Sequence, residues 1–216
     1  MPDCMKPILF STPMVQAILE DRKTMTRRVV KPQADSLDSV YCGNGPKGFG
    51  AYFHDENYPE EGSMFIPARY IPGDILWVRE TWGSYGYDFP ESNASYFLYR
   101  ADYPEGAKGY WYEPEEINWC DFPRWRPSIH MPHEAARLFL RVTDVRAERL
   151  QEITEADAQA EGVEPVYGND FASEKRHYPA FARLWEKLNT KRGYGWDTNP
   201  WVWVYTFERL ERPREG

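Results

Sequence analysis

The sequence lacks any long hydrophobic run. No stretch approaches the ~18 to 20 uninterrupted apolar residues that a membrane helix needs, and the first residues do not follow the charged, apolar, small-residue order of a signal peptide. We therefore expect a soluble, cytoplasmic protein that has no membrane partner.

Cysteine is also scarce. The three cysteines, Cys4, Cys42 and Cys120, are odd in number and far apart. They form neither a CxxC pair nor a disulfide framework. This usage fits a reducing compartment.

Positive charge is in deficit, with 26 Lys plus Arg against 34 Asp plus Glu and a net charge of −8. This balance argues against a protein whose whole surface clamps nucleic acid, but it leaves a local basic site open. The 216 residues are 42% hydrophobic and 16% aromatic, which is enough for one sizeable core and too little to promise two. We predict one folded domain with elaborations.

Hydrophobic periodicity predicts a mixture of strands and helices. The predicted strands cover residues 7–10, 75–79, 138–145 and 201–207, and the predicted helices cover about 13–21, 155–161 and a stretch opened by Pro179. The first helix is expected to start at Ser11-Thr12-Pro13, with a capping hydroxyl followed by proline, and Thr154 is expected to cap the second. Residues 33–68 and 83–128 are rich in turn formers and are interpreted as loop-rich insertions, with one candidate strand at 96–99.

The strands are not separated by regular crossover helices, which argues against a doubly wound parallel sheet. The sequence instead predicts an α+β fold, a small and mostly antiparallel β-barrel with helices packed outside.

Two motif matches are rejected. Residues 43–48 match GxGxxG, but no strand precedes them and Pro46 disfavours the opening of a helix. His130, His133 and Glu134 match the order of no zinc motif, and Pro132 lies between the histidines. We expect neither a metal nor a cofactor.

A basic cluster is more informative. Residues 22–31 carry five positive charges and no acid: Arg22, Lys23, Arg27, Arg28 and Lys31. One interpretation is a solvated helix end whose cations complement the helix dipole. The other is an anion or nucleotide site, where a base could stack on one of the nine tryptophans, such as Trp77, Trp82, Trp119 or Trp125.

Lys23 and Thr26 are three residues apart, which places an amine and a hydroxyl on one face if the helical turn persists. Neighbouring cations and lost hydration would lower the pKa of Lys23. A neutral Lys23 could deprotonate Thr26 for attack on a carbonyl, whereas a charged one could stabilise an oxyanion while a carboxylate activates water.

Several segments together resemble an ASCH-domain protein of the PUA-like superfamily, in the long, Trp-rich form common in bacteriophages and prophages. They are residues 16–31, the Pro-Gly-Asp-x-Leu-x-Val stretch at 72–78, the strand at 138–145 with the following 150–158, and the closing aromatic strand. The resemblance implies a single PUA-like domain over residues 1–216, with insertions at about 33–68 and 83–128.

The same resemblance implies a chemistry, because the small bacterial N4-acetylcytidine amidohydrolases of this superfamily use a lysine, a threonine and a late glutamate. Carried over, these resemble Lys23, Thr26 and Glu161 as catalytic residues. The expected substrate-binding residues are Arg28, Arg27, Trp77 and Trp82. The implied function is removal of an acyl group from N4 of a modified cytidine, either free or within a nucleic acid.

Three alternatives remain from the sequence. A non-catalytic binder of RNA or single-stranded DNA would use the basic segment as a phosphate track. A ribonuclease is implied by the same resemblance, because at least one type of ASCH protein resembles a metal-dependent ribonuclease. An accessory interaction module of a phage would use the insertions.

Overall fold

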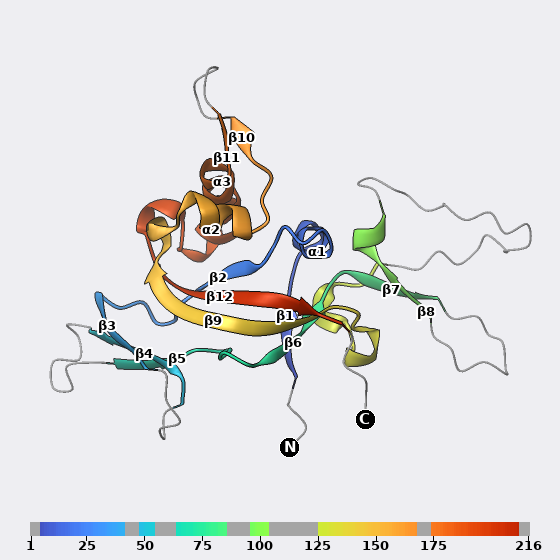
Figure 1. The fold of residues 1–216 in the computed structure, drawn as a ribbon, viewed down its shortest axis with the longest axis horizontal. Helices are drawn as coiled ribbons and strands as arrows, with labels where there is room; N and C mark the ends of the chain where they lie inside the picture. The colour runs from blue at the N-terminus through green and yellow to red at the C-terminus, as the bar shows by residue number, and fades with distance from the viewer. Residues whose placement is uncertain are drawn as a thin grey trace, which may run out of the picture.

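The computed structural model describes residues 5–41, 48–54, 64–85, 96–103, 125–167 and 174–211. They form an α+β fold with mostly antiparallel strands and few helices (Figure 1). At its centre is a five-stranded sheet in the order β1-β6-β9-β12-β2. Its strands are β1 (Lys6–Leu9), β6 (Ile75–Arg79), β9 (Phe139–Arg149), β12 (Trp201–Leu210) and β2 (Met25–Val29). Only the β1–β6 pair is parallel.

The inner strand β12 contributes to two hydrophobic clusters because successive side chains of a strand point to opposite faces. Trp203 and Tyr205 belong to the larger cluster, whereas Val202 and Val204 pack with the helical side. Burial on both faces explains why this segment is a continuous apolar and aromatic run in the sequence. The predicted strands in this sheet are confirmed.

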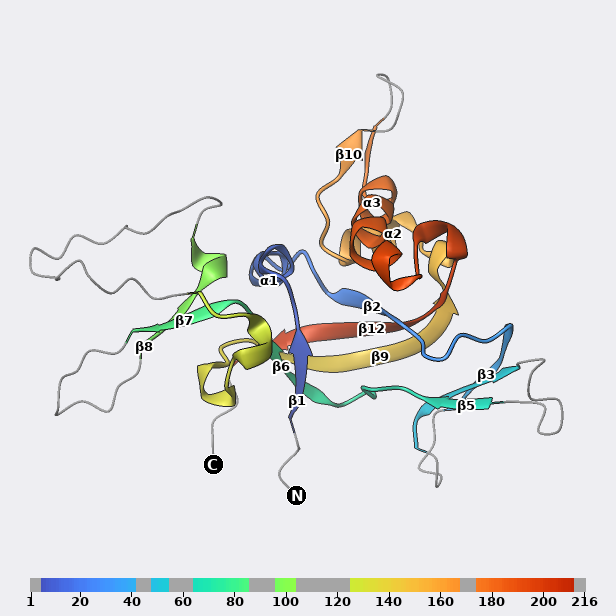
Figure 2. The same cartoon turned by 180° about the vertical axis from the view of Figure 1, so that it is seen from behind.

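Three α-helices accompany the sheet: α1 (Thr12–Leu19), α2 (Glu155–Ala160) and α3 (Tyr178–Asn189). In both views, α2 and α3 lie on the opposite side of the sheet from the strands β3 to β5 (Figure 2). The predicted cap of α2 is confirmed, since the Thr154 hydroxyl accepts a bond from the backbone of Asp157. Ser11 is the N-cap residue of α1, but its side chain makes no capping bond.

The helical turn that would place Lys23 and Thr26 on one face does not persist through the basic cluster. Helix α1 ends at Leu19, Asp21 adopts a left-handed backbone conformation with φ 57°, and the chain then enters β2. Lys23 and Thr26 are therefore not related by a helical turn. The side chains of β2 alternate between the two faces of the sheet.

The edges of the curved sheet approach each other without pairing. β1 and β2 are the two outer strands, yet the guanidinium of Arg28 donates to the carbonyl oxygen of Leu9 at 2.8 Å. Among the described residues the strand pairings do not close a barrel. A side chain, rather than a backbone ladder, spans the opening.

The segment 33–68 is not only a loop. It contains a three-stranded antiparallel sheet of β3 (Ser36–Tyr41), β4 (Gly50–His54) and β5 (Met64–Pro67). Phe53 of β4 contributes to the main core and packs with its ring centroid 5.5 Å from that of Trp201. The turn-forming residues obscured strands that are only four to six residues long.

The segment 83–128 is described in part. β7 (Trp82–Tyr85) pairs with β8 (Tyr96–Tyr99), which confirms the predicted strand at 96–99. Residues 86–95 and 104–124 lie outside the described residues, as do Trp119 and all three cysteines. The remaining elements are η1 (Arg100–Asp102), η2 (Ser128–His130), η3 (His133–Ala135), η4 (Leu150–Glu152), η5 (Thr190–Arg192), η6 (Trp196–Thr198), β10 (Val166–Tyr167) and β11 (Lys175–Arg176). Over the described ranges, no helix has the length and apolar character to cross a membrane.

Candidate functional site

Lys23 and Glu161 meet in the interior although 138 residues separate them. Lys23 lies between α1 and β2 and forms an isolated bridge with Glu161, the residue that ends α2. The ammonium Nζ of Lys23 donates to Glu161 Oε2 at 2.7 Å, to the Glu161 carbonyl at 2.9 Å and to the Met25 carbonyl at 2.7 Å. The lysine side chain is 0% exposed and the glutamate side chain 4% exposed. All three N–H donors of the ammonium therefore have protein acceptors.

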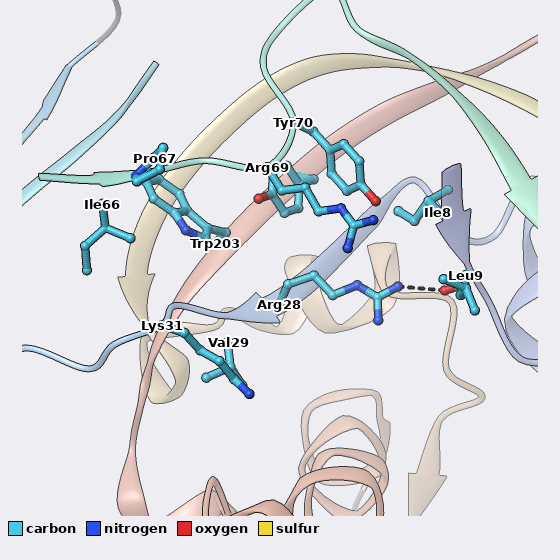
Figure 3. Close-up of a pocket in the computed structure, with 11 residues that line it drawn as sticks. Ile8, Leu9, Arg28, Val29, Lys31, Ile66, Pro67, Arg69, Tyr70 and Trp203 are labelled. Atoms are coloured by element: carbon cyan, nitrogen blue, oxygen red, sulfur yellow. Dashed lines mark hydrogen bonds between the residues drawn. The ribbon is translucent and has the colours of Figure 1, made fainter. Parts of the chain in front are cut away.

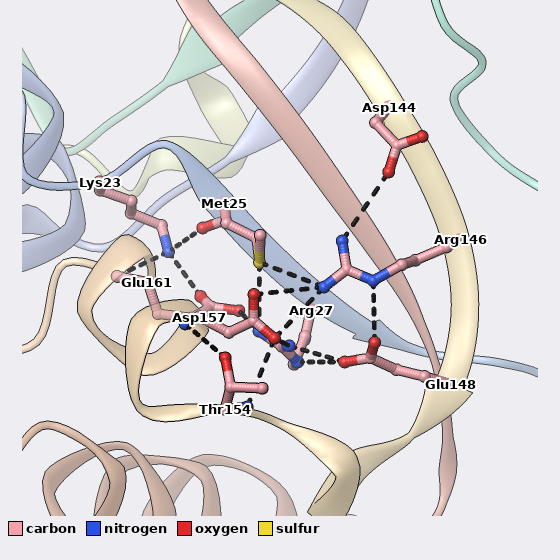
Figure 4. Close-up of polar contacts among 9 residues, drawn as sticks. All are labelled: Lys23, Met25, Arg27, Asp144, Arg146, Glu148, Thr154, Asp157 and Glu161. Carbon is pink, nitrogen blue, oxygen red and sulfur yellow. Dashed lines mark hydrogen bonds and ion pairs between the residues drawn. The ribbon is translucent and has the colours of Figure 1, made fainter.

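Arg27 holds the other side of the same carboxylate (Figure 4). Its guanidinium lies 3.3 Å from Glu161 Oε1, 2.6 Å from Glu148 Oε1 and 3.0 Å from Asp157 Oδ2. Arg146 contacts Glu148 and Asp157 from β9. Because Arg27 is buried and fully engaged with three carboxylates, it positions Glu161 and does not line the pocket described below.

Burial and the neighbouring carboxylate shift the pKa of Lys23 in opposite directions. Burial lowers the pKa of Lys23 because the charged ammonium loses its hydration. The carboxylate of Glu161 acts in the opposite direction, and Arg28 and Arg27 lower the pKa further. The sequence argument for a lowered pKa is thus supported in direction, but burial is the leading cause and the neighbouring arginines are minor ones.

Thr26 is buried in β2, between Met25 and Arg27 in sequence and opposite Tyr205 in the β2–β12 pair. Strand alternation puts it on the same face as Arg28 and on the opposite face from Arg27. Within the described part of the chain, no hydrogen bond joins Thr26 to Lys23 or Glu161. The structure brings two of the three predicted catalytic residues, Lys23 and Glu161, into contact, and it leaves Thr26 on β2 outside that contact.

A pocket of about 340 Å³ opens beside Arg28 of β2, and neither Lys23 nor Glu161 lines it (Figure 3). It lies between β1, β2, β12 and the segment that joins β5 to β6. Its walls are Ile8, Leu9, Arg28, Val29, Lys31, Ile66, Pro67, Arg69, Tyr70, Trp203 and Tyr205. The volume is at the lower end of the range for small-molecule sites, about 300–1,000 Å³.

Phe10 connects the pocket with the buried pair. The Phe10 ring lies under two cations, with the Arg28 guanidinium carbon 5.4 Å and Lys23 Nζ 5.6 Å from its centroid. Arg28 lines the pocket, whereas Lys23 does not. Arg28 of the pocket wall and Lys23 of the buried pair therefore lie against the same aromatic ring.

The aromatic residues of the pocket are two tyrosines and a tryptophan. Tyr70 and Tyr205 pack edge to face with their centroids 5.1 Å apart, and the Tyr70 hydroxyl donates to the Pro7 carbonyl at 2.7 Å. Burial raises the pKa of Tyr205 to about 12, and burial also raises the pKa of Tyr70. Both phenols stay protonated at neutral pH, and the Tyr70 hydroxyl is a hydrogen-bond donor.

The predicted stacking tryptophans do not line this pocket. Trp77 is buried against Ala136 and Phe139, and Trp82 is buried against Met131 and Ala135. Each tryptophan belongs to a small hydrophobic cluster apart from the main core. In both clusters the indole ring packs against residues in or near the short turn η3. The expectation that they stack on a base is corrected for this pocket.

Sequence reasoning missed Arg69, Tyr70, Trp203 and Tyr205. A signal was present for the last two, since alternation along the closing strand places Trp203 and Tyr205 on one face. Arg69 and Tyr70 precede the Pro-Gly-Asp turn, and no local pattern marks them as neighbours of β2. Only the fold brings these segments together.

No cluster of three or more His, Cys, Asp or Glu side chains in the described ranges is arranged to hold a metal ion. The carboxylates near Lys23 are occupied by cationic side chains instead. His133 packs edge to face on Trp77, with centroids 5.2 Å apart.

Comparison of the chain with protein-family models, with curated proteins and with solved structures gave no match.

Proposed function

We propose that the protein is an amidohydrolase that removes an acyl group from the exocyclic N4 of a modified cytidine. The observation that carries the proposal is the buried contact of 2.7 Å between Lys23 and Glu161, together with the Phe10 ring that Lys23 shares with Arg28 of the aromatic and cationic pocket. A buried lysine and carboxylate of this kind can supply charge stabilisation and proton transfer at one point. The ASCH-type, PUA-like assignment belongs to this proposal, supported by the curved sheet with helices on its outside.

The resting contact suggests how the two groups act. A bound acyl carbonyl takes the place of Glu161 Oε2 on Lys23, so the ammonium then donates to the oxygen that becomes negatively charged. The released carboxylate of Glu161 remains next to Arg27, whose guanidinium limits its movement. The hydroxyl of Thr26 orients the substrate from β2.

The hydrolysis balances with water as the only co-reactant. Glu161 accepts a proton from water as the hydroxide oxygen bonds to the acyl carbon. When the tetrahedral intermediate collapses, the bond from carbon to N4 breaks, and Glu161 returns the proton to N4. The products are the amine of cytidine and the free carboxylic acid.

The base would lie against Trp203 and Tyr205, which take the role first expected of Trp77 and Trp82. Aromatic side chains stack on nucleobases with about 1–3 kcal/mol per base. Apolar residues such as Ile8 and Ile66 complete the wall.

The test is hydrolysis of N4-acetylcytidine to cytidine, followed by chromatography. We expect Glu161→Gln and Lys23→Met to reduce turnover more than tenfold, and Thr26→Val to reduce it as well. Glutamine preserves the shape of Glu161 and an acceptor for Lys23, so this variant tests charge and proton transfer with little change in packing. Arg183→Gln, an exposed substitution on α3, is the control and keeps full turnover.

Thermal unfolding of each variant separates lost chemistry from lost folding. Normal turnover in a folded Glu161→Gln variant would exclude the mechanism. Absence of hydrolysis by the wild type, on the nucleoside and on acetylated RNA, would exclude the activity.

A second candidate is a non-catalytic binder of single-stranded nucleic acid. The observation in its favour is the charge of the pocket wall, which contains Arg28, Lys31 and Arg69 and no carboxylate. This candidate predicts binding without turnover and an affinity that falls steeply with salt, because neutralised phosphates release counterions.

A further inference from the structure

We propose that Arg28 and Arg69 form a phosphate-binding subsite in the pocket, with Lys31 at its rim, so that the ligand is a phosphorylated cytidine derivative rather than a free nucleoside. The inference rests on the proposed function for the identity of the base. The phosphate could belong to a mononucleotide or to a nucleic-acid strand, and the experiment below distinguishes these sources.

The charge of the pocket wall favours an anionic ligand. Arg27, Arg137 and Arg146 each contact at least two carboxylates. In the described ranges, by contrast, no carboxylate lies within ion-pair distance of Arg28, Lys31 or Arg69. The pocket thus gathers three cations that have no carboxylate partner among the described residues, in a chain of net charge −8.

The placement of Arg28 and Arg69 also suits a phosphate. The side chains of Arg28 and Arg69 extend toward the same space from opposite walls of the pocket (Figure 3). Only Nη2 of Arg28 has an acceptor among the described residues, the Leu9 carbonyl at 2.8 Å, which fixes the guanidinium and leaves its other N–H groups for a ligand. Such a planar fork binds phosphate oxygens with two parallel hydrogen bonds.

Arg28 and Arg69 also carry like charges. Burial is the leading cause of the lowered pKa of Arg28, and Arg69 lowers it by a smaller amount. A phosphate between the two arginines would convert their repulsion into two charge-assisted contacts. The protonated phenols of Tyr70 and Tyr205 add no negative charge that would repel it.

The interior of the pocket suits the base, and its surface end suits the phosphate. Trp203 and Tyr205 belong to β12 in the interior, whereas Arg69 and Lys31 are exposed at the surface. A ligand with its base against the aromatic side chains and its phosphate against the arginines fits a volume of about 340 Å³. Longer strands would continue past Lys31 into solvent.

The experiment compares kcat/KM for N4-acetylcytidine and N4-acetylcytidine 5′-monophosphate in the wild type, Arg69→Gln and Arg183→Gln. We expect the wild type to prefer the phosphorylated substrate at least tenfold. Arg69→Gln should reduce this ratio to near one, whereas Arg183→Gln, which loses the same charge on exposed α3, should keep it. Equal ratios in the wild type and Arg69→Gln would overturn the subsite.

Binding of cytidine 5′-monophosphate and of cytidine, measured by calorimetry, separates the subsite from the hydrolase proposal. Phosphate-dependent binding that Arg69→Gln abolishes, without hydrolysis of any acetylated substrate, would support the subsite and reject the hydrolase. Hydrolysis without any phosphate preference would do the reverse. A single-stranded RNA oligonucleotide that binds more tightly than the monophosphate, with dependence on Arg69, would assign the phosphate to a strand, and equal affinity would assign it to a mononucleotide.

Discussion

Gly162 packs against Lys23 so closely that a β-carbon at position 162 would lie 2.7 Å from the β-carbon of Lys23. The same atom would lie 2.8 Å from the β-carbon of Ala17, and Gly162 has a φ of +77°. Glycine is thus required here for its backbone conformation and for the space it leaves. The turn after α2 can bring Glu161 into contact with Lys23 because its neighbour Gly162 has no side chain.

We expect Gly162→Ala to reduce the midpoint of thermal unfolding much more than Gly193→Ala. Gly193 also has a positive φ, +83°, but a β-carbon there would meet nothing within 4 Å. The backbone strain alone costs about 1–2 kcal/mol, which corresponds to roughly 2–8 °C for a chain of this size. Calorimetry of the two variants isolates the contact with Lys23, and equal shifts would show that the chain relaxes there without cost.

Arg27 is expected to be essential for stability. Replacing it by methionine keeps the apolar part of the side chain but leaves Glu148, Asp157 and Glu161 without their shared cation. Breaking a buried ion pair in this way costs about 3–5 kcal/mol.

The matched control for Arg27→Met is Arg141→Met, which removes the half-exposed pair with Glu208. An exposed pair contributes about 0–1 kcal/mol. Denaturant unfolding of both variants provides the comparison. A loss below about 1 kcal/mol for Arg27→Met would mean that the three carboxylates find other partners.

The contrast between these two arginines shows what could be predicted from sequence. The run at 201–207 and the capped helix at 155–161 have local signals, an apolar strand and a hydroxyl followed by an acid three residues later, and both were predicted. The strand β2 was not, because arginine and lysine are normally exposed. Their burial depends on carboxylates more than 100 residues away.

The residues of the candidate site also differ in whether a sequence pattern marks them. Lys23 and Glu161 were selected by their place in a recognisable pattern, and the fold brings them together. Trp203 lies on the closing strand, where alternation was a usable signal, and it is opposite Arg28 in the β2–β12 pair. Arg69 belongs to a segment that only the fold places beside β2, so no periodicity or spacing marks it. Trp77 and Trp82 were misplaced because a tryptophan count does not show which rings fill a core.

Lys23 should make the stability depend on pH in the alkaline range. Its folded-state pKa lies below the ordinary value of 10.5, so between these two values the folded state binds fewer protons than the unfolded state. Stability therefore rises with pH across that window. We expect Lys23→Met to remove this rise in denaturant unfolding measured from pH 8 to pH 10, and an unchanged profile would indicate that the lysine titrates normally.

Tyr205 should produce the opposite slope at higher pH. Its pKa is raised to about 12 by burial, against 10 for an ordinary tyrosine, so the folded state holds the phenolic proton longer than the unfolded state. The contribution of this group is fully present below pH 10 and is lost as the pH rises through about 12. A pKa difference of this size corresponds to about 2–3 kcal/mol.

We expect the free energy of unfolding of Tyr205→Phe to depend less on pH than that of the wild type between pH 10 and pH 12. Tyr167→Phe is the exposed control and keeps the wild-type slope. An ultraviolet titration in which Tyr205→Phe loses a component near pH 10 instead would place the phenol in contact with water, and the pocket wall would then be more open than the structure describes.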